Sequence, residues 1–107
     1  MMFLAGQPGL DKNGIIEAPG DIVAQFQLAL ANIKTVMDAA GGEMTDIVKM
    51  QIFCTDKMMY KAHLKELGAV YREFFGKYYP ATTFVECADL YDDGALVEID
   101  TIAVLKS

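Results

Sequence analysis

The alternation between helical and strand-like patterning constrains this chain more than any other feature. Two runs carry apolar residues at helical spacing, and each is followed by glycine: residues 22–40 and 57–75. Four shorter runs have the residue types and spacing of strands: residues 1–5, 47–54, 82–89 and 96–105. The resulting order, β-α-β-α-β-β, predicts an α+β domain in which both helices cover one face of a sheet.

Residues that start or stop helices support these boundaries. Asp21 precedes the first helical run and is placed to cap it through its side-chain oxygen. Gly41-Gly42 is placed to end that helix, and Gly76 is placed to end the second, because glycine adopts the left-handed closing conformation readily. Both helices therefore have defined ends in the sequence itself.

Length and composition limit the possible functions. The chain has 107 residues, which is enough for one domain over residues 1–107. Hydrophobic residues make up 53% of so short a chain, and this favours an oligomer. The net charge of −6 argues against a basic surface for nucleic acid or for anionic lipid. No apolar run is long enough to cross a bilayer.

The cysteines and the single histidine indicate no disulfide and no metal site. Cys54 and Cys87 both fall within predicted strands, which favours buried free thiols. His63 has no second histidine and no cysteine or carboxylate at a recognised ligand spacing. The N-terminal residues lack the basic and apolar segments of a secretory signal, so we expect a cytoplasmic protein. We also expect no bound cofactor.

The predicted sheet has two different faces, because successive strand residues point to opposite sides. One face is almost wholly apolar and is expected to lie under the helices: Val48, Met50, Ile52, Cys54, Thr83, Val85, Cys87, Val97, Ile99, Thr101, Ala103 and Leu105. The other mixes apolar and charged residues: Ile47, Lys49, Gln51, Phe53, Thr82, Phe84, Glu86, Ala88, Leu96, Glu98, Asp100, Ile102 and Val104. A subunit interface containing polar pockets reconciles this mixture. Asp92-Asp93-Gly94 between the last two strands predicts a hairpin.

Four stretches, taken in order and spacing, resemble the RidA/YjgF family over nearly the whole chain. They are Phe3-Leu4-Ala5-Gly6-Gln7, Ala39-Ala40-Gly41 leading to Asp46-Ile47-Val48-Lys49, Phe74-Phe75 leading to Tyr79-Pro80-Ala81, and Ala95-Leu96-Val97-Glu98-Ile99-Asp100-Thr101-Ile102-Ala103. The resemblance implies a chorismate-mutase-like fold with a mixed sheet, assembled as a homotrimeric barrel with small-molecule pockets between subunits. It also implies hydrolysis of reactive enamines and imines to keto acids and ammonia.

The resemblance also assigns site residues. Glu98 matches the family glutamate that positions or activates water, so it is the expected catalytic residue. Thr82 stands where the family has a carboxylate-binding arginine, and Ala5 stands where serine is common. The family's N-terminal strand with its pocket tyrosine has no counterpart in this sequence. Gly6, Thr82 and Phe84 are the expected ligand-binding residues, with Thr82 and Phe84 on the face that carries Glu98.

Simpler interpretations of these residues remain open. Glu98 is also explained as a polar interface residue that pairs with Lys49 of a neighbouring subunit. Phe84 is also explained by packing and Gly6 by a strand end or tight turn. Arg72, on the second helix, is expected to be solvated.

Two functions from different classes therefore remain. One is a hydrolytic deaminase that uses Glu98. The other is a non-catalytic trimer that binds a small metabolite, since threonine cannot copy the two-point pairing of arginine with a carboxylate. Ribonuclease activity, a label also used in this family, is disfavoured by the acidic charge.

Overall fold

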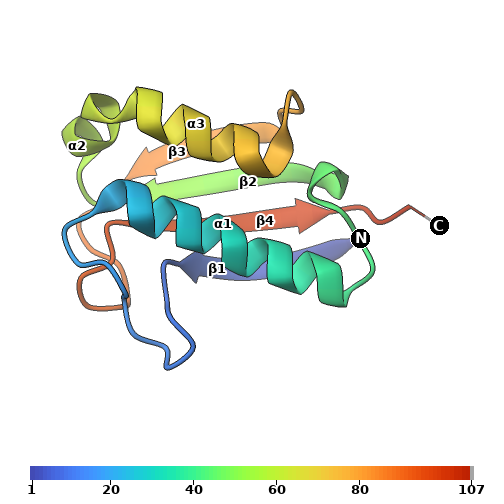
Figure 1. Cartoon of the computed structure of the whole chain (residues 1–107), viewed down its shortest axis with the longest axis horizontal. Coiled ribbons are helices and arrows are strands. Elements are labelled where there is room, and N and C mark those ends of the chain that lie inside the picture. Colours follow the sequence, from blue (N-terminus) through green and yellow to red (C-terminus); the bar gives the residue numbers. More distant parts are fainter. Residues whose placement is uncertain (107) are drawn as a thin grey trace.

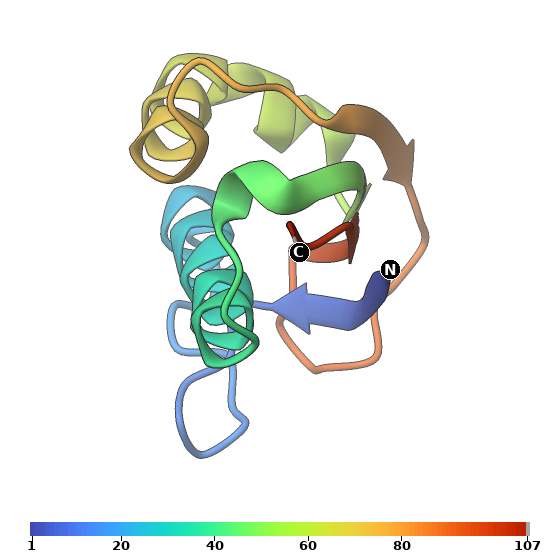
Figure 2. The same ribbon diagram turned by 90° about the vertical axis from the view of Figure 1, so that its right-hand side faces the viewer.

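A four-stranded sheet covered on one face by helices forms the domain (Figure 1). The computed structural model describes residues 1–106. The strands are β1 (Met2–Pro8), β2 (Ile47–Cys54), β3 (Ala81–Glu86) and β4 (Val97–Ala103). The helices are α1 (Ile22–Ala39), the 3₁₀ turn η1 (Met44–Asp46), α2 (Lys57–Ala62) and α3 (Leu64–Phe75). Figure 2 shows α1 and α3 together on one side of the sheet.

The sheet is mixed, with strand order β1-β4-β2-β3. β4 is antiparallel to both of its neighbours, β1 and β2, whereas β2 and β3 are parallel. The α2–α3 segment supplies the crossover that a parallel pair of strands needs. The α+β class and the coverage of one face by helices are therefore confirmed.

The predicted hairpin between the last two strands is wrong. β4 lies between β1 and β2 and does not pair with β3. Asp92-Asp93-Gly94 still forms a local turn, in which the Ala95 amide donates to Asp92 O at 3.0 Å and Gly94 has φ +82°. The Asp93-Gly94 pair therefore specified a turn, but it could not specify which strands pair with one another. Alternate β4 residues are buried under the helices, so a central position suits this strand.

The first helix has the predicted boundaries. The Asp21 side chain accepts a 3.0 Å hydrogen bond from the Ala24 amide, and Gly41 follows the helix with φ +77°. The buried residues of α1 form one stripe against the sheet: Ile22, Gln25, Phe26, Ala29, Leu30, Ile33 and Met37.

The second predicted helix, residues 57–75, is in fact two helices that meet at His63. The His63 amide donates to Tyr60 O, an i to i−3 bond that closes α2 as a tighter turn. His63 Nδ1 also lies 2.8 Å from Met59 O, which holds its ring at the break. Gly76 ends α3 with φ +62°, as predicted.

The two faces of the sheet differ from the prediction in β3. Paired residues of neighbouring strands point to the same face, and Met50 pairs with Thr82 while Ile52 pairs with Phe84. Thr82, Phe84 and Glu86 therefore belong to the helix-covered face, and Thr83 and Val85 to the opposite one. The prediction had these two sets exchanged, because alternation alone does not say which set faces the helices.

Two strand ends also depart from simple alternation. A bulge between Ile47 and Lys49 buries Ile47 and leaves Val48 43% exposed, the reverse of the prediction. A second irregularity between Leu4 and Gln7 lets β1 continue past Gly6, where the sequence predicted its end. Both irregularities shift side chains between the faces of the sheet.

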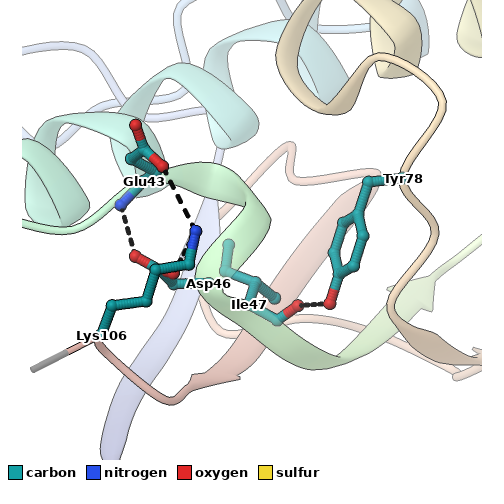
Figure 3. A network of polar contacts seen from close by, with 5 residues as sticks. All are labelled: Glu43, Asp46, Ile47, Tyr78 and Lys106. Carbon is teal, nitrogen blue, oxygen red and sulfur yellow. Dashed lines mark hydrogen bonds and ion pairs between the residues drawn. The ribbon is translucent and has the colours of Figure 1, made fainter.

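Polar contacts hold the start of β2 against the rest of the domain (Figure 3). The Tyr78 hydroxyl donates to Ile47 O at 2.5 Å, and the Glu43 amide donates to the buried Asp46 carboxylate at 2.9 Å. Lys106 Nζ lies 3.8 Å from carboxylate oxygens of both Glu43 and Asp46. The C-terminal segment therefore closes over the same turn from which β2 begins.

Two further sequence predictions concern thiols and membranes. Cys54 and Cys87 are free, but only Cys54 is fully buried, whereas Cys87 is half-buried just beyond β3. Among residues 1–106, no helix combines the length and apolar character needed to traverse a bilayer.

Candidate functional site

The face of the sheet without helices carries both apolar and charged side chains. We call it the open sheet face and define it by the register of the four strands: Phe3, Lys49, Gln51, Phe53, Thr83, Val85, Glu98, Asp100 and Ile102. Phe3 is 72% exposed and Val85 is 40% exposed, although both are large and apolar. Such a combination is typical of a surface that another molecule covers.

Glu98 lies near the start of β4, on a central strand of the sheet, and its carboxylate packs against Gly6. In β4, Glu98 pairs with Pro8 of β1 on one side and with Phe53 of β2 on the other. A Cβ atom added at Gly6 would lie only 2.5 Å from Glu98 Oε2 and 2.9 Å from Glu98 Cδ. The Glu98 carboxylate therefore occupies the space that glycine leaves at position 6. These two predicted site residues are brought together across β1 and β4.

The electrostatic surroundings of Glu98 favour its protonated form. Burial raises the pKa of the Glu98 carboxyl above its ordinary value, and the nearby acidic groups of Asp92 and Asp100 raise it further. Asp92 comes from the turn that precedes β4, so the irregular connection contributes to the site. A carboxyl with a raised pKa in a partly buried position is suited to exchange protons with a bound molecule.

Asp100, two residues further along β4, has neighbours that stabilise its ionised carboxylate. Burial raises the pKa of Asp100, while the positive charge of Lys49 and a backbone hydrogen bond from Gln51 lower it in part. With the amide nitrogen of Gln51 facing Asp100, it donates to both carboxylate oxygens at 3.1 Å. Asp100 is thus held by its neighbours, whereas Glu98 has fewer constraints on its carboxylate.

The structure separates Thr82 and Phe84 from Glu98. Both side chains lie on the helix-covered face, so the prediction that they share a face with Glu98 is wrong. The Thr82 hydroxyl donates to Pro80 O at 2.9 Å, and the Phe84 ring packs on Tyr60 with ring centres 4.5 Å apart. Their predicted role in ligand binding remains a prediction, and within this subunit it would concern a different surface.

Gln25 of α1 positions the start of β4, a role that the sequence did not predict for this residue. Its side chain is fully buried, and its Nε2 donates to Ala18 O at 3.0 Å and to Gly94 O at 3.1 Å. Its Oε1 accepts a 2.7 Å bond from the Leu96 amide. The available signal was a glutamine directly before Phe26, inside the apolar stripe of a helix, where a polar residue needs partners.

The acidic residues of the site do not form a metal centre. Within residues 1–106, no group of three or more histidine, cysteine, aspartate or glutamate side chains is arranged to hold a metal ion. On the open sheet face, the raised pKa of the Glu98 carboxyl suits it to proton transfer, next to apolar residues such as Phe53 and Ile102.

Comparisons with known proteins agree with this architecture. The family described as endoribonuclease L-PSP matches residues 1–105. A RutC family protein from Pyrococcus horikoshii is 37% identical over 103 residues, which cover 95% of this chain and 77% of that protein. A protein from Escherichia coli K12, named "Putative reactive intermediate deaminase TdcF", is 37% identical over 108 residues, which cover 97% of this chain and 78% of that protein.

A solved structure gives the same result at the level of the fold. The crystal structure of a conserved Rid family protein from Yersinia pestis superimposes with a TM-score of 0.86 at 28% identity, covering 97% of this chain and 77% of that one. The match spans the sheet and the helices together. On the evidence of the fold, the family match over residues 1–105 and these relatives, the chain belongs to the RidA/YjgF family, also described as the endoribonuclease L-PSP family.

Proposed function

We propose that this protein hydrolyses small imines and enamines to carbonyl compounds and ammonia, in a pocket that a homotrimer completes around Glu98. The observation that carries the proposal is the Glu98 carboxylate, seated in the space left by Gly6 and with its pKa raised by burial and by Asp92 and Asp100. The name of the Escherichia coli relative, "Putative reactive intermediate deaminase TdcF", supports the same class of reaction.

The proposed reaction needs one group that first accepts and then donates a proton. The Glu98 carboxylate accepts a proton from water as the water oxygen bonds to the imine carbon, and it returns this proton to the nitrogen, which gives a neutral carbinolamine. Glu98 then accepts the proton of the new hydroxyl as the carbonyl forms and passes it to the nitrogen as the carbon–nitrogen bond breaks, which releases ammonia. Enamines enter the same route after tautomerising to imines. Water is the only co-reactant.

A second subunit is part of the proposal because the open sheet face leaves large apolar side chains exposed beside Glu98. Phe3, Val85 and the half-buried Phe53 and Ile102 leave apolar surface beside Glu98. Covering this surface removes apolar area from water and excludes bulk water from the carboxylate. Packing of three such faces around a common axis meets both needs. Light scattering tests it, and a stable particle of 11.8 kDa would contradict it.

A second candidate function is the binding of a small metabolite without turnover. It is favoured by the charges of the open sheet face. Among the residues that define this face, Lys49 is the one cation and none is arginine. Lys49 acts on the charge of Asp100, so it is not free of internal partners. A substrate that carries a carboxylate would lack the fixed two-point partner that a guanidinium provides.

One experiment separates the two functions. A threonine dehydratase generates the imine in situ, semicarbazide traps what remains, and keto-acid release is compared with buffer alone. We expect acceleration by the native protein, loss of most of it in Glu98→Gln, and retention in the matched control Glu66→Gln, an exposed residue of α3. Release no faster than in buffer would reject the deaminase and leave the binding function. Equal activity of Glu98→Gln would reject the role of Glu98.

A further inference from the structure

A cavity lies on the helix-covered face, on the opposite side of the sheet from Glu98. It has a volume of about 290 Å³ and is bounded by α2 and α3 on one side and by β2 and β3 on the other. This is close to the lower end of the range for small-molecule sites, roughly 300 Å³. Met50, Ile52 and Leu67 form its apolar floor. The cavity is built from one subunit and does not involve the residues of the open sheet face.

Arg72 is the charged group of this cavity. It is the single arginine in the sequence, and the lining contains no aspartate or glutamate, although the whole chain has a net charge of −6. Within residues 1–106, Arg72 makes no ion pair and no side-chain hydrogen bond. Its guanidinium therefore has N–H donors that the protein itself does not use. Arg72 is exposed, as the sequence predicted, and it also lines this cavity.

Gly68, one turn before Arg72, lies beside the guanidinium. A Cβ atom at position 68 would lie 3.4 Å from Arg72 Nη1, which is van der Waals contact. The arginine side chain therefore lies along α3 at the edge of the cavity, with the bare backbone of position 68 on one side of it.

Tyrosine rings form the walls. The Tyr71 ring is stacked between Phe75, at 4.6 Å and 19°, and Tyr79, at 5.2 Å and 9°. The Tyr71 hydroxyl donates to Tyr78 O, and burial raises the pKa of Tyr71 to about 12, with Tyr79 and Tyr78 adding to the effect. Tyr71 is therefore a neutral aromatic surface. Tyr79 is 70% exposed at the opening, where an unburied aromatic ring is available to a ligand.

We propose that this cavity binds a small monocarboxylate with a planar apolar body. The carboxylate would pair with the Arg72 guanidinium through two parallel N–H to oxygen bonds, which the planar fork of arginine favours. The body of the ligand would lie on the apolar floor against the exposed ring of Tyr79 and the edge of the Tyr71 ring. A phosphate monoester is less suited, because the lining offers one cation and the Thr82 hydroxyl already donates to Pro80 O.

The test uses phenylacetate as the probe and phenylacetamide, its uncharged match in shape, as the control ligand. Binding to the full-length native protein is followed by calorimetry and by changes in the tyrosine ring signals in NMR spectra. We expect saturable binding of phenylacetate at millimolar concentrations, at least roughly tenfold tighter than phenylacetamide, because a charged hydrogen-bond pair is lost with the amide.

Variants separate the guanidinium from general charge. Arg72→Gln is expected to weaken phenylacetate binding by at least roughly tenfold, and Arg72→Lys to weaken it less, because lysine keeps the charge but not the two-point geometry. Lys65→Gln, which removes an exposed charge of α3 outside the cavity, is the matched control and should leave affinity unchanged. Arg72 is exposed, so these variants should fold. Absence of saturable binding, equal binding of the amide, or full affinity in Arg72→Gln would overturn the proposal.

Discussion

The Leu96 amide donates a 2.7 Å hydrogen bond to Oε1 of the fully buried Gln25, which ties the start of β4 to α1. The same side chain donates to Ala18 O and Gly94 O. One residue of the first helix therefore holds the segment before the helix and the turn before the last strand. Because Glu98 is two residues after Leu96, this contact also fixes where the Glu98 carboxylate lies.

Replacement of Gln25 by leucine should therefore destabilise the protein strongly. The change leaves three backbone groups without their partner, and a buried unsatisfied group costs about 1–3 kcal/mol. We expect the free energy of unfolding to fall by roughly 2–4 kcal/mol, since some of these groups can reach water. Urea denaturation measures it. The control Gln27→Leu, at an exposed position of the same helix, should change stability by less than about 0.5 kcal/mol. Equal losses in both variants would contradict the role of Gln25.

Replacement of Gly6 by alanine should displace the Glu98 carboxylate. The added Cβ would come within 2.5 Å of Glu98 Oε2, so the glutamate must rotate away. If the proposed reaction occurs, imine hydrolysis should fall roughly 10- to 100-fold, as expected for a misplaced catalytic group. Circular dichroism should show an unchanged fold. Ala69→Ser, at an exposed position of α3 on the other side of the sheet, is the control and should keep its activity. Full activity of Gly6→Ala would show that the position of Glu98 does not matter.

The stability of the native protein should depend on pH through Glu98. Its folded pKa is raised above 4.5, so the folded state holds this proton more tightly than the unfolded state does. Ionisation of Glu98 therefore destabilises the fold, and the loss is complete above the raised pKa and absent well below 4.5. Glu98→Gln should be more stable than the native protein at neutral pH, and the difference should shrink on acidification.

Urea unfolding between about pH 4 and pH 7 measures this difference. The exposed residue Glu66 provides the control, because Glu66→Gln should follow the native curve across the whole range. A Glu98→Gln variant that is less stable than the native protein at neutral pH would show that the ionised carboxylate is stabilised by partners, against the direction of its pKa.

Replacement of Gly68 by alanine should separate stability from ligand binding. Alanine in a helix interior is favoured over glycine by about 1 kcal/mol, so the free energy of unfolding should rise by an amount of that order. The new methyl group would contact Arg72 Nη1 at 3.4 Å and restrict the guanidinium at the edge of the cavity. Phenylacetate binding should weaken at the same time, as measured by calorimetry. A more stable variant with unchanged affinity would show that Gly68 does not serve the cavity.

The local pattern of residues was sufficient to predict most of the elements. The cap at Asp21, the glycine ends of α1 and α3 and the bounds of β2 follow from the sequence, because they depend on neighbours a few residues away. The break at His63 was not predictable in this way. It comes from one i to i−3 hydrogen bond in an otherwise helical run.

The candidate site was predicted only in part. Glu98 and Gly6, which the resemblance to the family assigned to a site, lie side by side because β1 and β4 pair, and their roles in the site remain predictions. Thr82 and Phe84 lie on the other face, because the parallel register between β2 and β3 sets the direction of every β3 side chain. A shift of the β2–β3 register by one residue would have turned the β3 side chains to the opposite faces of the sheet.

The sequence alone determined that helices and strands alternate, where α1 begins and ends, where α3 ends, and that alternate residues of β2 and β4 are mostly apolar. These properties arise from backbone preferences and from the spacing of residues close in the chain. Only the tertiary structure decided that β4 enters the centre of the sheet, that Gln25 holds its start, and that Arg72 and Thr82 line one cavity. Each of these depends on contacts between residues far apart in the sequence, whose pairing no local pattern specifies.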